Sequence, residues 1–133
     1  MAFQFSDALR NAALDAMETA AGTAPTLTIR TGSVPANCAA ARTGTVLATL
    51  ALPSNWMADA SAGAKTLLGT WQDAAADATG TAAHFSISQG LTCHAQGTVT
   101  ATGGGGDMTL DNTSIATGQQ VNVTAFNLTA GGA

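Results

Sequence analysis

The chain has 133 residues, the length of a single domain, and only 9% of them are charged, where roughly 25% is usual for a soluble domain. The formal net charge is −4, and four cations are too few for the roughly six to ten phosphates of a typical nucleic-acid contact. This argues against direct nucleic-acid binding. No apolar run is long enough to span a membrane, so we expect no membrane insertion.

The first predicted element is a helix over Ser6–Ala21. This stretch holds no Gly or Pro, Ser6 suits the N-cap position, and Gly22 suits the position after the last turn. Its apolar residues recur at helical spacing as one narrow stripe made of Phe5, Leu9, Ala12, Ala13, Ala16, Met17 and Ala20. Because a helix this short gains most of its stability from tertiary contacts, we expect the stripe to dock on something.

After Pro25 the pattern changes to the alternation typical of β-strands. The first predicted strand is 26–30, and the second lies within residues 43–52. The second has apolar residues on both faces, with Leu47 opposite Val46, Ala48, Leu50 and Leu52, which is typical of a central strand. Residues 65–71 form a less regular third candidate.

Four further strands are expected in the second half of the chain: 81–88, 91–99, 108–110 and 120–129. Gln89-Gly90 predicts a hairpin turn between the first two of them. Residues 103–106 are all glycine and predict a flexible loop. In the last strand the apolar positions change parity after Val123, which predicts a β-bulge near Ala125.

These elements predict a mainly β fold, an antiparallel β-sandwich or jelly roll with one N-terminal α-helix. We divide the chain into an N-terminal arm and amphipathic helix, residues 1–24, and a β-sandwich, residues 25–133. No linker separates the two parts, so we expect a single domain overall.

Two cysteines, Cys38 and Cys93, are too few for a disulfide framework. The first residues, 1–5, lack the cationic and apolar regions of a signal peptide, so we expect synthesis in a cytoplasm, where free thiols are the default. A particle that leaves the cell can oxidise such thiols within or between chains. A Cys38–Cys93 disulfide is therefore one of two states that the sequence leaves open.

Titratable side chains are scarce, and we predict no catalytic, cofactor-binding or metal site and no cofactor. His84 and His94 lie on the polar parity of their strands and are expected to be exposed. Cys93 and His94 are neighbours in a strand and point to opposite faces, which argues against a shared metal or a Cys–His nucleophile. Asp73 and Asp77 are expected in a solvated connection. We therefore expect a protein that is not an enzyme.

Trp56 and Met57 form a candidate contact site for a partner. They follow Pro53 and precede a loop of small residues, so an exposed Trp56–Met57 pair would resemble an interaction hot spot. The alternative is that both belong to the core, as buried aromatic residues more often do. Phe3, Phe5 and Leu9 are the other candidate contact residues, because they lie on the arm and the helical stripe.

Five segments from Pro25 onward carry a family resemblance: TGTVLATL (43–50), ATGTAAHFSI (78–87), QGTV (96–99), DMTL (107–110) and SIATGQQVNVTAF (114–126). In order and spacing they resemble a family of small proteins encoded among the head and tail structural genes of tailed bacteriophages. The segments record strands and turns rather than reacting groups. Cys38, Cys93 and the four-glycine run are not part of the family's pattern.

The resemblance implies a virion structural protein, foremost a capsid decoration (cement) protein on the surface of the capsid, assembled in the cytoplasm of a bacterial host. Its implied partners are the major capsid protein, copies of itself as a homo-oligomer, or both. The helical stripe then docks preferentially on a neighbouring molecule. Alternatives are a tail, neck or baseplate protein and, less favoured, a carbohydrate-binding β-sandwich, which would usually present more Trp and Tyr than the two Trp found here.

Overall fold

The computed structural model describes residues 3–130, and its helix α1 (Asp7–Ala21) has the predicted boundaries. Ser6 is the N-cap: its side-chain oxygen accepts a hydrogen bond from the backbone N–H of Leu9 at 3.2 Å. At the other end Gly22 has a φ of 88°, and its N–H donates to the carbonyl of Glu18. The helix therefore starts and stops at the local signals that the sequence provides.

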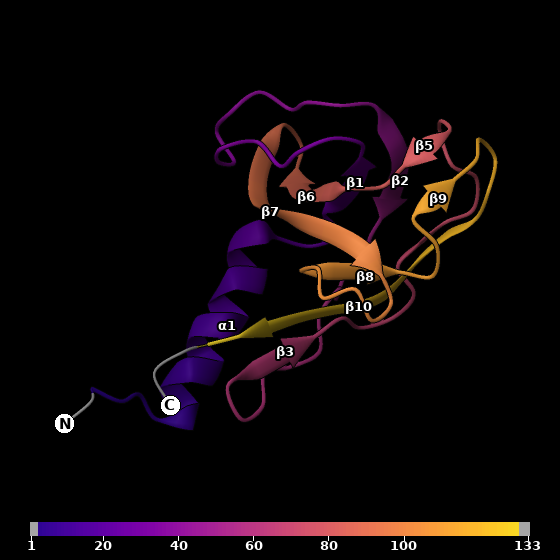
Figure 1. The fold of residues 1–133 in the computed structure, drawn as a ribbon. Coiled ribbons are helices and arrows are strands. Elements are labelled where there is room, and N and C mark those ends of the chain that lie inside the picture. Colours follow the sequence, from indigo (N-terminus) through magenta and orange to yellow (C-terminus); the bar gives the residue numbers. More distant parts are fainter. Residues whose placement is uncertain (1–2, 131–133) are drawn as a thin grey trace.

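Ten strands follow α1 (Figure 1): β1 (Thr26–Arg30), β2 (Val46–Ala51), β3 (Ala64–Thr66), β4 (Gln72–Asp73), β5 (Gly80–Thr81), β6 (His84–Gln89), β7 (Thr92–Ala101), β8 (Met108–Leu110), β9 (Ser114–Ile115) and β10 (Val121–Thr129). Hydrogen-bonded neighbours run in the order β2-β1-β6-β7-β8-β10-β3, and β4 pairs with β10 beside this path. Strands β5 and β9 form a separate pair. Every pairing between named strands is antiparallel except β7–β8, which is parallel.

The sheet curls so that its two halves enclose one core, which gives the predicted mainly β, sandwich-like fold with one N-terminal helix. Phe85 of β6 and Phe126 of β10 meet across this core, edge to face, with ring centroids 5.5 Å apart. The ring of Trp71 also contacts Phe126, with centroids 5.6 Å apart and the ring planes tilted by 39°. Aromatic rings from distant parts of the chain thus hold the two halves together.

Several strand predictions are confirmed in detail. Strand β1 has the predicted boundaries, and β10 changes its register against β8 between Val123 and Ala125, where the bulge was expected. The β6–β7 hairpin turns at Gly90-Leu91, one residue later than predicted. In the 65–71 region only β3 and a bridge from Leu67 to Met57 are present.

The prediction that β2 is a central strand is wrong, because β2 is the first strand of the sheet path. Its outer edge is covered by residues 73–77, which start at the last residue of β4 and do not pair with β2 as a strand. The N–H of Thr49 donates to Asp73 at 3.0 Å, its hydroxyl donates to Asp77 at 2.9 Å, and the N–H of Asp77 donates to the carbonyl of Leu47 at 2.8 Å. The two carboxylates therefore protect a sheet edge from within a connection that is largely solvated, since Asp73 is half-buried and Asp77 is exposed.

Two glycines of the four-glycine run, Gly104 and Gly106, are required by close packing. The run returns the chain from the end of β7 to the start of β8, so the loop must lie directly against β7. A Cβ on Gly104 would come within 2.7 Å of Thr100, and one on Gly106 within 2.9 Å of the same side chain. Contacts this short do not occur between real side chains, so only glycine fits at these two positions.

The long connection 31–45 covers the outer face of β6 and β7. Cys38 in this connection forms a disulfide with Cys93 of β7, with Cα atoms 5.3 Å apart. Gln96 of β7 donates to the carbonyl of Pro35 at 2.7 Å and accepts from Arg42 at 2.9 Å. Of the states that the sequence left open for the two cysteines, the structure has the bond within the chain.

This covering connection corrects the prediction for one of the two histidines. His84 is completely buried, and its Nδ1 lies 2.9 Å from the carbonyl oxygen of Gly32. Its strand face is polar, as its parity indicated, but 31–45 lies over that face. His94 is exposed, as predicted, and lines a hollow beside Met17 of α1. The two imidazoles therefore do not form a common site.

Candidate interaction surface

Helix α1 packs on the sheet through its polar face. Only Leu14 and Ala21 of the helix are fully buried, and half-buried polar residues surround them. The guanidinium of Arg10 donates from Nη2 to the carbonyl of Ala130 at 2.9 Å. The side-chain oxygen of Asn11 accepts from the N–H of Gly63 at 2.9 Å. Hydrogen bonds rather than a broad apolar contact therefore fix the N-terminal half of the helix.

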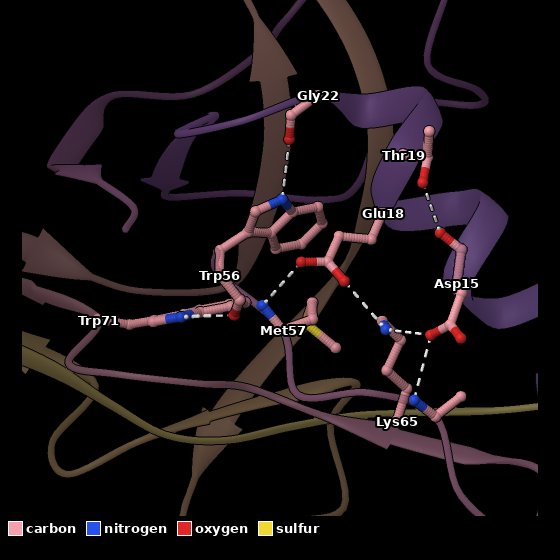
Figure 2. A network of polar contacts seen from close by, with 9 residues as sticks. Asp15, Glu18, Thr19, Gly22, Trp56, Met57, Lys65 and Trp71 are labelled. Atoms are coloured by element: carbon pink, nitrogen blue, oxygen red, sulfur yellow. Dashed lines mark hydrogen bonds and ion pairs between the residues drawn. The ribbon is translucent and has the colours of Figure 1, made fainter. Parts of the chain in front are cut away.

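Lys65 of β3 lies at the centre of this contact (Figure 2). Its ammonium group is fully buried and lies 2.5 Å from Asp15 and 2.9 Å from Glu18, both on α1. Asp15 also accepts from the N–H of Ala60 at 3.1 Å, and Glu18 from the N–H of Met57 at 3.3 Å. The two carboxylates thus neutralise a buried cation and satisfy the backbone beneath the helix.

The pKa values of this cluster favour the charged forms. The hydrogen bond from Lys65, aided by the one from Ala60, lowers the pKa of Asp15 below its ordinary value. Burial alone would lower the pKa of Lys65, but the hydrogen bonds to Asp15 and Glu18 outweigh burial and raise it. The Asp15–Lys65 ion pair therefore persists through the neutral pH range.

The predicted apolar stripe of α1 is exposed. We call its helical part the apolar α1 face: Leu9, Ala12, Ala13, Ala16, Met17 and Ala20. This face contains no charged residue, and Leu9 and Met17 expose 52% and 54% of their surface. The stripe therefore does not dock on the chain's own sheet. The carboxylates that neutralise Lys65 are on the opposite side of the helix, so that side faces inward.

The N-terminal arm, residues 3–6, extends this exposed region. Phe3 is 81% exposed and Phe5 42% exposed, and their rings touch edge to face with centroids 5.1 Å apart. Of the six large exposed apolar side chains in residues 3–130, four belong to the arm or the apolar α1 face. The predicted contact residues Phe3, Phe5 and Leu9 are thus brought together at one end of the molecule.

Trp56 and Met57 are not available to a partner, so that part of the prediction is wrong. Trp56 is 4% exposed and Met57 is fully buried. The indole N–H of Trp56 donates to the carbonyl of Gly22 at 3.0 Å, and its ring contacts Trp71 at a tilt, with centroids 5.9 Å apart. The pair forms the part of the core that lies under the C-terminal end of α1.

The polar cluster around Lys65 was missed in the sequence. Lys65 is the only lysine of the chain, and it lies in a predicted strand among apolar residues. Asp15 and Glu18 are three residues apart and therefore share one side of the helix. These two signals together predict a buried ion pair, but only if the helix is already known to lie on that strand.

The described residues contain no familiar ligand site. In residues 3–130 no three His, Cys, Asp or Glu side chains are close enough to hold a metal ion. No helix in the same range has the length and hydropathy needed to cross a bilayer. Comparisons with protein families, with characterised proteins and with solved structures found no match.

Proposed function

We propose that this protein is a structural protein of a tailed-bacteriophage virion, a decoration protein that binds the major capsid protein on the capsid surface. The observation that carries the proposal is the exposure of the apolar α1 face while the charged side of the same helix is buried. Helices of isolated domains usually turn their apolar side inward. An exposed apolar patch of this kind marks a protein-interaction site. The family resemblance supplies the identity of the partner.

The face is held rigidly, which favours binding. Four points along the helix are tied to the body, through Arg10, Asn11, Asp15 and Glu18. A surface that is ordered before binding loses little conformational entropy when a partner covers it. The buried polar contacts of α1 therefore serve to present its apolar side outward.

The size of the surface fits a contact repeated many times. A helix of 15 residues is roughly 22 Å long, so its exposed side is smaller than the roughly 800 Å² that each partner contributes to a standard interface. Each contact is weak by itself, but many copies on a symmetric shell act together. With only 9% charged residues, neighbouring copies repel one another little.

The test is cosedimentation with capsids that lack decoration. Ala16→Glu places a charge within the apolar α1 face, and we expect it to weaken binding at least about tenfold, the effect of roughly 1.4 kcal/mol. Ala8→Glu is the matched control, because Ala8 is exposed on α1 outside the face. It should bind like the wild type. Unchanged binding by Ala16→Glu, or finding the protein only with separated tails, would refute the proposal.

A further inference from the structure

Strand β8 fills only part of the space between β7 and β10. It pairs with residues 99–101 of β7 and with 123–126 of β10. Beyond its start, residues 93–97 of β7 have a strand partner only in β6, and residues 127–129 of β10 only in β3, within the described chain. We call the space between these two edges the strand gap. It is an open hollow of about 490 Å³.

Both walls of the strand gap offer backbone hydrogen-bonding groups. The N–H of Val99 points toward β6, where it donates to the carbonyl of Ala83. Because backbone direction alternates along a strand, the N–H and C=O of Gln96 point into the gap. On the other wall the N–H of Ala130 points toward Gly63 before β3, so the groups of Asn127 and Thr129 point into the gap. An extended segment placed there has partners on both sides.

The lining of the strand gap combines apolar side chains with the polar Gln96, Thr109 and Asn127. Phe85, Ala95 and Phe126 line it, and Asp107 at its rim is already bound by the N–H and hydroxyl of Thr98. Two smaller hollows continue along β10. One of about 110 Å³ lies between Leu128 and Met17, and one of about 300 Å³ lies beside Ala130. The open edge of β10 therefore borders a trough of mixed lining, with Asp107 at its rim and Arg10 beside Ala130, in which apolar side chains can contact Phe85 and Phe126.

The N-terminal arm has the properties of such a strand. Phe3 and Phe5 are two residues apart, so an extended backbone places both rings on one side. No residue before Asp7 carries a charged side chain. In Figure 1 the arm continues outward from the N-terminal end of α1, where Phe5 and Ala130 line one hollow. Phe3 and Phe5 are 81% and 42% exposed, so both side chains can be covered by a partner.

We propose that the strand gap of one copy receives the N-terminal arm of a second copy, which adds as a strand between β7 and β10 with its phenyl rings toward Phe126. Main-chain hydrogen bonds hold such an added strand, and alternate side chains give it specificity. The contact is heterologous, so copies join head to tail into a ring or chain. This inference rests on the proposed function: copies of the decoration protein bind one another through the arm, and the apolar α1 face stays free to bind the capsid.

The test is amide exchange of the full-length protein, measured residue by residue at low and hundredfold higher concentration. The amides of Gln96, Asn127 and Thr129 should exchange at least about tenfold more slowly at the higher concentration. In the double variant Phe3→Ser/Phe5→Ser this slowing should disappear. Adding a synthetic peptide of residues 1–6 to that variant should restore it.

The matched control is Leu68→Ser/Leu91→Ser, which removes two exposed apolar side chains outside the arm and should behave like the wild type. If the exchange rates of the three amides do not depend on protein concentration, the proposal is wrong. This holds both for amides that stay unprotected and for amides that the chain's own arm protects. Self-association that leaves these amides unchanged overturns it as well. None of these results affects the capsid-binding test with Ala16→Glu, so the two proposals fail separately.

Discussion

The ammonium group of Lys65 lies 2.5 Å from the carboxylate of Asp15, a residue 50 positions earlier in the chain. Lys65 is fully buried, whereas the side chain of Asp15 is 49% exposed. The pair therefore lies at the boundary between core and solvent, where a cation can be neutralised without burying its partner. Together with the contacts of Arg10, Asn11 and Glu18, this pair holds the polar side of α1 toward the sheet and so presents the other side outward.

We expect Lys65→Met to lower the free energy of unfolding by about 2 kcal/mol. Breaking a fully buried ion pair costs about 3–5 kcal/mol, and here the half-exposed Asp15 recovers part of this through hydration. Denaturant unfolding measures the change. Amide exchange should become faster throughout α1, because the helix loses its central attachment. The control is Asp7→Asn, which breaks the exposed Arg10–Asp7 pair and should cost less than about 1 kcal/mol. Equal costs would contradict a central role for Lys65.

Stability should fall at both ends of the pH range. The pKa of Asp15 is lower in the folded than in the unfolded chain, so its contribution is present above about pH 3.8 and is lost as the pH falls through the folded pKa. The pKa of Lys65 is raised, so its contribution is present below about pH 10.5 and is lost as the pH rises through the folded pKa. Denaturant unfolding across pH measures both limbs. In Asp15→Asn the free energy of unfolding should fall less at acid pH than in the wild type. An equal fall in this variant would show that Asp15 is not its cause.

Reduction of the Cys38–Cys93 disulfide should destabilise the fold and release the connection 31–45. For a separation of 55 residues the chain-entropy model gives about 4 kcal/mol. Unfolding with and without reductant measures the loss, and limited proteolysis should show new cleavage within 31–45. The variant Cys38→Ser/Cys93→Ser should be less stable and unaffected by reductant. If reductant left the wild type unchanged, the bond would not be a structural element.

Gly106→Ala should destabilise the protein by about 1–3 kcal/mol, because the new Cβ overlaps the side chain of Thr100. The two closest contacts, with Cγ2 and Oγ1 of Thr100 at 2.9 Å, are removed by Thr100→Ala, and only the contact with the backbone N at 3.0 Å stays. Thr100→Ala has its own cost, since Oγ1 accepts from the N–H of Gly106 at 3.0 Å. The double variant should therefore be more stable than the sum of the two single changes predicts. If denaturant unfolding showed that the stability losses of the two single variants simply add in the double variant, the Cβ at position 106 would not clash with Thr100.

Local signals in the sequence determined the elements whose causes lie within a few residues. Ser6 and Gly22 mark the ends of α1 through hydrogen bonds to its own first and last turns. The alternation over 26–30 predicts β1, and the change of parity after Val123 predicts the bulge in β10. Each of these features depends on neighbours along the chain, so a single sequence is enough to find it.

The tertiary structure alone decided which surfaces are covered. The stripe on α1 is visible in the sequence, but its exposure depends on Lys65, which approaches from another part of the chain. The same holds for His84 beneath the connection 31–45 and for the edge of β2 beneath Asp73 and Asp77. A periodic pattern indicates that one face of a helix or strand is more apolar than the other. Which face is buried depends on long-range contacts, because only these supply the partners for its polar groups.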